Sequence, residues 1–424
     1  MQGSCLAAIP DVSSAKLGCD VLRPTPVLVA TPPLPQTQIS VIVPVRNEAE
    51  TLPKTLLALA NQIDFEGNAV DTSGYEVIVF ANNCTDSSAA IARHFAQQHP
   101  ELQLHVIEQT LPEGEAYIGR VRQMLMNEAS RRLLSLGRPS GIMASTDGDS
   151  RVERHWIAAI CHEIACGADA VGGRTVTDQA ERAALDKATK TAYLRFVGYR
   201  YLIKQLESCL DPDPFDRSPR HYQFFGANFA VTQQMYAQAG GMPLVHTSED
   251  VAFHRAIVKA GAKVRHSALM RVTTSARRQG RATLGLADRL SQFQTLGQRQ
   301  ESFWVESAAE VEAKLLARQH LRRYWLQTTS DRPAPAPHRL GQLAARLAVP
   351  RAELHRAIEQ SLTVGDLFQR VEQCQQTLGL WQQQWATVPI EVAIADLRLS
   401  LSQWRSRGSR GSRSGGELRS LVEV

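Results

Sequence analysis

The 424-residue sequence lacks three features that would assign it to a special class. Its seven cysteines contain no C-x-x-C pair and are odd in number, which argues against a disulfide framework and a cysteine-bound zinc site. No apolar run reaches the roughly 18 residues of a transmembrane helix. The N-terminus lacks the charged start and apolar core of a signal peptide. We therefore expect a cytoplasmic protein without a transmembrane segment.

Composition and charge are also far from extreme. With 43% hydrophobic and 21% charged residues, the chain is expected to be globular, and its length allows one large domain and a smaller one. The formal net charge of +5 permits contact with phosphates or an acidic membrane surface but requires neither. We expect no nucleic-acid partner for the folded part, and peripheral membrane contact stays open.

Local composition divides the chain into four parts. Residues 1–37 are rich in proline and predict an extended leader. Residues 38–300 form the main predicted domain. Residues 301–404 are rich in Leu, Ala, Gln and Arg and predict a helical accessory region. Residues 405–424 are rich in Arg, Ser and Gly, which is typical of a disordered tail; binding to anionic lipid or nucleic acid is the alternative.

Short β-branched runs alternate with amphipathic stretches in the main domain. The predicted strands are 39–45, 75–80, 102–108 and 141–145, and the predicted helices between them are 51–60, 87–98 and 118–136. A long helical stretch over 181–211 and a strand over 221–231 follow. Such alternation predicts β-α-β units and a parallel sheet, which binds ligands at the carboxyl ends of its strands.

Polar residues follow three of these strands. The loops are Arg46-Asn47-Glu48, Asn82 to Asp86, and Asp147-Gly148-Asp149, and we expect them to converge at one edge of the sheet. Further along, Ser248 predicts a helix N-cap with Glu249 and Asp250 in the first turn. Turns and caps alone would explain each loop singly, but they explain three convergent polar loops less well.

These segments carry a resemblance to a known family. The stretch VIVPVRNE, the later DGDS and the SED that follows about a hundred residues on resemble, in this order, a family 2 glycosyltransferase over about residues 39–290. The resemblance implies the GT-A fold, an α/β, Rossmann-like and mostly parallel sheet flanked by helices. It implies transfer of a sugar from a nucleotide-sugar donor, with UDP-sugars favoured, to an unknown acceptor hydroxyl. The Q-x-x-R-W motif of processive synthases is missing, which favours a non-processive enzyme.

The two aspartates of DGDS suit metal-assisted departure of a diphosphate. A hard divalent cation such as Mn²⁺ or Mg²⁺ is held by carboxylates and neutralises the leaving group. By resemblance, Asp149 binds the metal directly and Asp147 faces the ribose or a metal-bound water. His266 is the candidate for a third metal ligand, with a structural histidine as the alternative.

The acidic pair suits the acceptor side of the reaction. An attacking hydroxyl must lose a proton, which calls for a carboxylate base. By resemblance Asp250 is that base and Glu249 orients the acceptor, which predicts an inverting enzyme. The alternatives are a retaining transferase of the glucosyl-phosphoglycerate type and a catalytically silent nucleotide-sugar-binding or scaffold protein.

The remaining candidates would hold the donor. By resemblance Pro44 shapes the first loop, and Asn47 and Glu48 reach the uracil or ribose. Asn82 and Asn83 stand where the family often has an aspartate, and an amide can still pair with a pyrimidine edge. Asp86 keeps an acidic position of the family, with a helix N-cap as an equal alternative.

Arginines after residue 275 are candidates for holding phosphates. Arg277, Arg278 and Arg281 could clamp phosphate oxygens of donor or acceptor, because guanidinium forks match them. A solvated basic face is the alternative.

Overall fold

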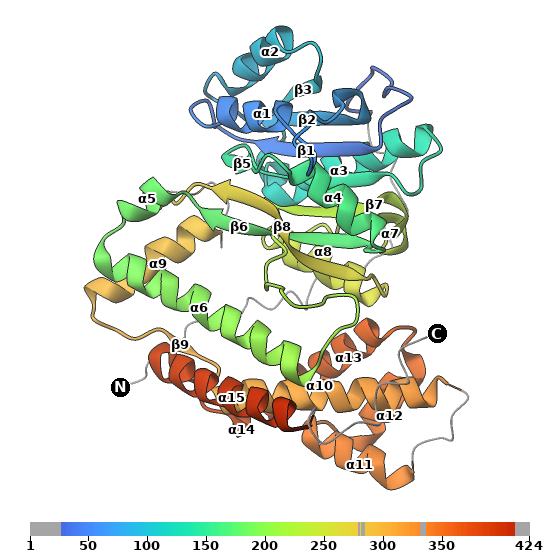
Figure 1. The fold of residues 1–424 in the computed structure, drawn as a ribbon, viewed down its shortest axis with the longest axis vertical. Coiled ribbons are helices and arrows are strands. Elements are labelled where there is room, and N and C mark those ends of the chain that lie inside the picture. The colour runs from blue at the N-terminus through green and yellow to red at the C-terminus, as the bar shows by residue number, and fades with distance from the viewer. Residues whose placement is uncertain (1–26, 279, 281–284, 331–335, 412–424) are drawn as a thin grey trace. The chain divides into compact units, whose positions relative to one another are not determined.

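The computed structural model describes residues 27–278, 280, 285–330 and 336–411 (Figure 1). The first 26 residues of the predicted leader, Arg281 and the predicted tail beyond Gly411 lie outside the described residues. Within the described ranges the chain forms two compact units. One contains residues up to 186 together with 219–292, and the other contains 187–218 together with the residues from 293 onward.

The first unit is built on a mostly parallel sheet. Its described strands are β1 Ile39–Val45, β2 Tyr75–Asn82, β3 Gln103–Gln109, β4 Ile142–Ser145, β5 Ser150–Val152, β6 Ala170–Thr177, β7 Phe229–Thr232 and β8 Val264–Thr274. They lie in the order β3-β2-β1-β4-β7-β6-β8-β5 (Figure 1). Only β7 and β5 run against the others. The predicted α/β class is confirmed.

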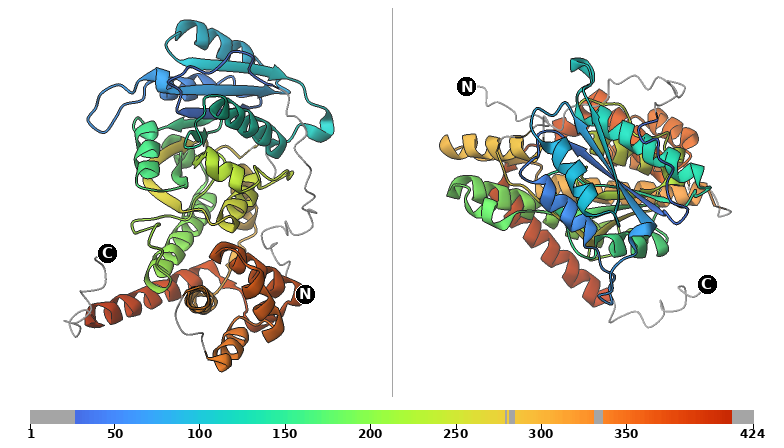
Figure 2. Two further views of the ribbon diagram at one scale, coloured as in Figure 1. Left: turned by 90° about the vertical axis from the view of Figure 1, so that its right-hand side faces the viewer. Right: turned by 90° about the horizontal axis from the view of Figure 1, so that it is seen from above.

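Helices cover both faces of this sheet because successive side chains of a strand point to opposite faces. Val41 and Val43 pack with α1 Leu52–Ala60, α2 Ser88–Gln98 and α4 Trp156–Ala165. Ile42 faces the other side and packs with α3 Ile118–Ser135, α7 Gln233–Gln238 and α8 Glu249–Lys259. Helix α3 lies along β1 on this second face (Figure 2). The near-continuous apolar runs of the sequence are those of strands buried on both faces.

Two element predictions are corrected by the structure. The strand predicted over 221–231 is wrong for residues 221–228, because β7 begins at Phe229. The Asn228 N–H donates to the Phe225 carbonyl at 2.8 Å, so a turn that contains Gly226 precedes the strand. The helical stretch predicted over 181–211 is divided into α5 Gln179–Ala183 and α6 Lys187–Leu210.

The described part of the predicted leader is packed against α3. The N–H groups of Leu28 and Val29 donate to the carboxylate of Glu128, at 3.3 and 3.2 Å. Arg132 donates to the Thr31 carbonyl at 2.6 Å. Residues 27–37 therefore contribute to the first unit, which a detached leader would not do.

The second unit is helical. Its larger elements are α6, α10 Ala308–Thr328, α11 Pro337–Arg346, α12 Arg351–Gln360, α13 Val364–Leu378 and α15 Ile390–Gly411. One apolar cluster joins α6, α10 and α15, so residues 187–218 group with the C-terminal helices and not with the rest of 38–300. Helix α15 continues to Gly411, and the predicted tail therefore begins inside a helix at Arg405. No helix in the described ranges is long and apolar enough to cross a membrane.

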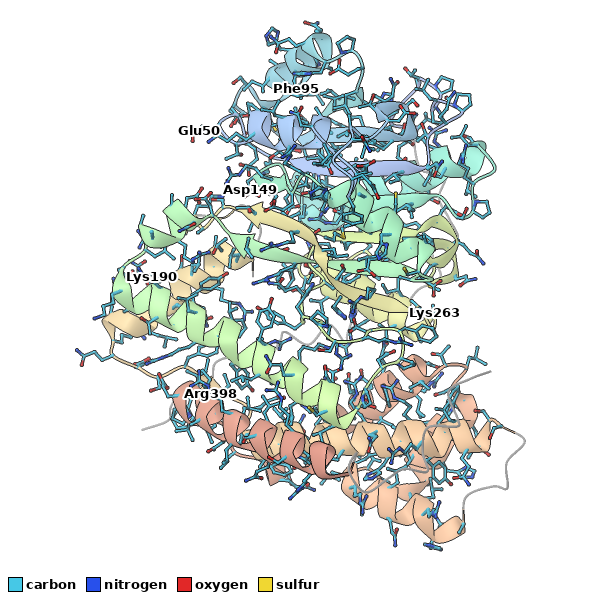
Figure 3. All side chains as sticks on the ribbon, viewed as in Figure 1. Glu50, Phe95, Asp149, Lys190, Lys263 and Arg398 are labelled. Atoms are coloured by element: carbon cyan, nitrogen blue, oxygen red, sulfur yellow. The ribbon has the colours of Figure 1, made fainter. Side chains whose placement is uncertain are left out.

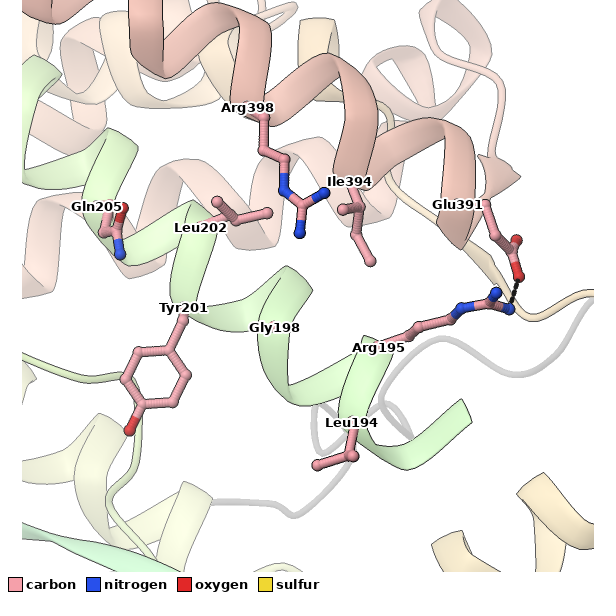
Figure 4. A pocket seen from close by; sticks show the side chains of 9 residues that line it. All are labelled: Leu194, Arg195, Gly198, Tyr201, Leu202, Gln205, Glu391, Ile394 and Arg398. Carbon is pink, nitrogen blue, oxygen red and sulfur yellow. Dashed lines mark hydrogen bonds and ion pairs between the residues drawn. The ribbon is translucent and has the colours of Figure 1, made fainter. Parts of the chain in front are cut away.

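A groove of about 500 Å³ runs between α6 and α15 of this unit (Figure 4). Leu202 of α6 and Ile394 of α15 give it apolar walls, and Arg398 points into it. Arg195 and Glu391 form an ion pair at one end.

Candidate active site

The predicted polar loops converge at one edge of the sheet. Strands β1, β4 and β8 end there, and Figure 3 labels Asp149 near the start of β5 at this edge. Arg277, three residues after β8, donates to both carboxylate oxygens of Glu48, at 2.8 and 2.6 Å. Its Nη2 also lies 3.0 Å from Oδ2 of Asp149. Arg277 thus links the loops that follow β1, β4 and β8.

Gly148 allows the DGD loop to lie directly on the first loop. Its carbonyl accepts hydrogen bonds from the hydroxyls of Thr55 at 3.0 Å and Thr51 at 3.3 Å. A Cβ at this position would lie 3.0 Å from Cγ2 of Val45 and 3.3 Å from Cγ of Glu48. Close packing therefore favours a small residue between the two aspartates.

Ionisation of the Asp149 carboxyl group is unfavourable in its surroundings. Burial raises its pKa to about 6, the charge of Asp147 acts in the same direction, and Arg277 opposes both. The local negative charge is thus only partly compensated by the protein. Such a carboxylate gains from an additional cation.

Arg122, which the sequence analysis did not single out, lies at the centre of the site. It is 2% exposed and extends from the first turns of α3. Its Nη2 donates to Oδ1 of Asp147 and its Nε to Oε1 of Glu249, both at 3.0 Å. One guanidinium therefore joins the DGD loop to the acidic pair about a hundred residues later in the chain. A signal existed in the sequence, because Arg122 shares the apolar face of α3 with Leu125 and Ala129.

The acidic pair begins α8. Glu249 is buried against Arg122, while Oδ2 of Asp250 accepts from the N–H of Gly226 at 2.9 Å. Burial raises the pKa of Asp250 to about 6, and the charge of Glu249 adds to this. Ser248 stands at the predicted N-cap position, but its φ is 56° and its side chain makes no capping hydrogen bond.

The second loop is tied to its surroundings by most of its predicted residues. Asn83 exchanges two hydrogen bonds of 2.9 Å with the backbone of Leu111. Oδ1 of Asn47 accepts from the N–H of Thr85 at 2.7 Å. Asp86 accepts from the N–H of Ala49 and of Ser88, each at 3.0 Å. The contacts of Asn47 and Asp86 hold the first and second loops together, and those of Asn83 tie the second loop to the segment after β3.

Two further predicted residues sit at the strand ends. Pro44 lies within β1, paired with Phe80 of β2. Asn82 ends β2, is 4% exposed, and its Oδ1 has no hydrogen-bond partner among the described residues. A buried acceptor without a partner is costly unless a ligand satisfies it.

His266 does not belong to this site. It pairs with Gly172 near the start of β8, whereas Ser150, next to Asp149, pairs with Thr274 at its end. Thr274 faces Thr177 of β6, five residues beyond Gly172, so about 17 Å of strand separates the two positions. Figure 3 labels Asp149 and Lys263, which precedes β8, at opposite ends of the sheet. The prediction of His266 as a metal ligand is wrong for this structure.

The remaining carboxylates fit a divalent cation only together with a substrate. Among the described residues, no three His, Cys, Asp or Glu side chains could hold a metal ion by themselves. Mg²⁺ is commonly bound by one or two carboxylates plus substrate phosphates and water. The oxygen atoms of Asp147 and Asp149, whose negative charge is only partly compensated by Arg122 and Arg277, match that kind of site.

A family model matches part of the sequence. Residues 40–218 match the family model "Glycosyl transferase family 2". The matched segment, which is less than half of the chain, is similar to this family. The mostly parallel sheet flanked by helices, with its polar loops at the carboxyl ends of the strands, is the architecture that the sequence predicted.

The chain is also similar to one curated protein and to two solved structures. Glycosyltransferase AglE of Haloferax volcanii is 29% identical over 136 residues, which is 32% of this chain and 38% of that protein. TarS of S. aureus is 12% identical with a TM-score of 0.40, over 73% of this chain and 48% of that one. Mannosyltransferase PcManGT from Pyrobaculum calidifontis, in complex with GDP-Man and Mn²⁺, is 16% identical with a TM-score of 0.38, over 89% of both chains. The matched regions thus span less than half the length of AglE and TarS.

Proposed function

We propose that the protein is a non-processive, inverting glycosyltransferase that moves a sugar from a nucleotide-sugar donor to an acceptor hydroxyl. The observation that carries this proposal is the single guanidinium of Arg122, which joins Asp147 of the DGD loop to Glu249 of the acidic pair. The two halves of the reaction need these two groups of carboxylates close together. The family 2 match over residues 40–218 supports the same reaction class.

On the donor side, Asp149 and Asp147 would hold Mn²⁺ or Mg²⁺. The cation supplies positive charge to the departing diphosphate. Asp149 would bind it directly, and Asp147, which is fixed by Arg122, would face the ribose or a metal-bound water. Arg277 contributes a second positive charge beside these carboxylates, while its fork holds Glu48. Arg278 is exposed nearby, where a solvated basic face remains the alternative.

The nucleotide would lie over the ends of β1 and β2. The unpartnered Oδ1 of Asn82 can accept an N–H from a nucleobase, which both uracil and guanine offer. Pro44, Asn47 and Glu48 shape the neighbouring loop. Asp86 supports this loop by accepting a hydrogen bond from the Ala49 N–H, and Asn83 ties the second loop to the backbone of Leu111. UDP-sugars stay the favoured donors.

On the acceptor side, Asp250 would act as the general base. Its pKa is raised to about 6, which makes it a stronger base than an ordinary aspartate. Because this value still lies below neutral pH, the group stays mostly ionised there. The N–H of Gly226 fixes one oxygen of the carboxylate. Glu249, held by Arg122, sits beside it and would orient the acceptor.

A donor screen tests the proposal. Melting temperature is measured with UDP- and GDP-sugars, each with Mn²⁺ and with EDTA, because a ligand of the folded state raises it by mass action. We expect a Mn²⁺-dependent increase with at least one donor, followed by release of its nucleoside diphosphate. NMR of the product then reads the anomeric configuration: inversion supports Asp250 as base, and retention favours the glucosyl-phosphoglycerate type. A protein that binds donors but never turns one over would be a silent binding protein.

A further inference from the structure

Arg122 uses all three of its guanidinium nitrogens. Nε donates to Glu249 and Nη2 to Asp147, while Nη1 donates to the hydroxyl of Ser145 at 2.7 Å and the carbonyl of Gly226 at 2.9 Å. A guanidinium is planar and its donors have fixed directions. The positions of these four partners are therefore set against one rigid group.

Gly226 extends this arrangement to Asp250. Its carbonyl accepts from Arg122 and from Ser145, and its N–H donates to Oδ2 of Asp250 at 2.9 Å. A Cβ at residue 226 would lie 2.5 Å from Nη2 and 2.7 Å from Cζ of Arg122. Only a glycine allows the guanidinium to approach this backbone. The glycine that interrupts the strand predicted over 221–231 thus has a specific packing role.

We infer that Arg122 is a positioning residue that sets the donor-side carboxylate Asp147 and the acceptor-side carboxylates Glu249 and Asp250 in one geometry. Asp147 and Glu249 are held directly, and Asp250 is held through the backbone of Gly226. The inference rests on the proposed function, which assigns Asp147 to donor binding and Glu249 and Asp250 to the acceptor. Arg122 touches neither reactant in this scheme and acts only through its partners.

Electrostatics favours the same role. Burial opposes the charge of Arg122, but Asp147 and Glu249 raise the pKa of its guanidinium above the ordinary value. The guanidinium is therefore permanently charged and lies between the carboxylates of Asp147 and Glu249. A lysine would keep the charge but would replace the fork by a single point of attachment, so charge and geometry can be separated by mutation.

The test compares Arg122→Lys with Arg132→Lys, a matched control on the same helix. Arg132 is also buried and paired with a carboxylate, Glu76, but it touches no residue of the candidate site. We expect Arg122→Lys to lower kcat by about 10²-fold, the effect of a displacement near 1 Å at the reacting groups. Affinity for UDP or GDP with Mn²⁺ should change little, because Asp149 and Arg277 remain. Arg132→Lys should lower the melting temperature without changing kcat per folded molecule.

Amide hydrogen exchange tests the network without turnover. In Arg122→Lys the N–H groups of Gly226 and Val251, which both donate to Asp250, should exchange faster, while in Arg132→Lys they should not. If Arg122→Lys does not fold, Ser145→Ala removes one hydroxyl from the same network and should speed exchange at Gly226. Unchanged exchange at both amides, or a wild-type kcat in a folded Arg122→Lys protein, overturns the inference. A wild type that turns over no UDP- or GDP-sugar contradicts the proposed function alone, since the exchange experiment still reports on the network.

Discussion

Helix α3 carries two buried arginines that are used in different ways. Arg132 and Arg122 are ten residues apart, which is about 15 Å along the helix. Arg132 forms hydrogen bonds of 2.9 and 2.5 Å with one carboxylate, Glu76, at the amino end of β2. Burial opposes ionisation of Glu76, but hydrogen bonds from His105 and Arg132 lower its pKa to about 2. Charge is balanced in this cluster.

The cluster around Arg122 at the opposite edge of the sheet is not balanced. Its single cation faces Asp147 and Glu249, with Asp250 close by, and burial raises the pKa of Asp250 to about 6. A buried arginine in contact with a carboxylate thus stabilises the fold where the two charges match, as in the pair of Arg132 and Glu76. Where carboxylates exceed the cation, ionisation costs stability, and such groups cluster at functional sites.

The largest expected effect is on turnover, from a substitution in the cluster around Arg122. Asp250→Asn keeps the size of the side chain but removes the proposed base, so turnover should fall by roughly two to four orders of magnitude. Melting temperature should not fall, because a carboxylate that is unfavourably ionised is replaced by a neutral group. Initial rate and melting temperature measured on one preparation decide between this role and a purely structural one. A less stable variant with a normal rate per folded molecule would remove Asp250 from the mechanism.

The cluster of Arg132 and Glu76 should show the reverse, a loss of stability with unchanged turnover. Glu76→Gln leaves the buried Arg132 without a charged partner and should cost about 3–5 kcal/mol of unfolding free energy. Turnover per folded molecule should stay at the wild-type value. Denaturant titration measures the loss. Arg93→Ala, which breaks the exposed ion pair with Glu108, is the control and should cost at most about 1 kcal/mol. A Glu76→Gln enzyme of normal stability would show that the two clusters do not differ as described.

A smaller effect is expected from pH. Asp250 must be ionised to accept a proton, so turnover at saturating donor and Mn²⁺ should fall about tenfold per pH unit below about 6. Stability changes in the opposite direction. Because the folded-state pKa of Asp250 is raised, its contribution to stability is complete below the ordinary value of 3.8 and is lost as pH rises through about 6. The melting temperature of Asp250→Asn, relative to wild type, should therefore increase between pH 4 and 7. A difference that is constant with pH would contradict the raised pKa.

The sheet and the loops at its edge could be predicted because their signals are local. Apolar runs such as 39–45 mark buried strands, and the Asp-Gly-Asp that follows 141–145 can only be placed at a strand end. The parallel order of β1, β2 and β4 then follows from the helices between them. The convergence of Glu48, Asp147 and Asp149 at one edge is a consequence of that order.

The centre of the site could not be predicted in the same way. Arg122 lies near the start of an ordinary helix, and only the tertiary fold brings its partners to it, which are Asp147, Ser145, Gly226 and Glu249. His266 shows the opposite error. Its place on a strand near the acidic pair in sequence suggested a ligand, but the register of β8 puts it at the far end of the sheet.

The central claim is that this edge of the sheet binds a nucleotide-sugar donor together with a divalent cation. Isothermal titration calorimetry of UDP and GDP binding, with Mn²⁺ and with EDTA, tests this claim most directly. The proteins are the wild type, Asp149→Ala and the control Glu66→Ala, which removes an exposed carboxylate. We predict Mn²⁺-dependent binding of at least one nucleotide to the wild type and the control. We predict loss of that binding in an Asp149→Ala protein that still folds, because a strand-end loop contributes little to core packing. Wild-type affinity in Asp149→Ala for every nucleotide tested would contradict the account.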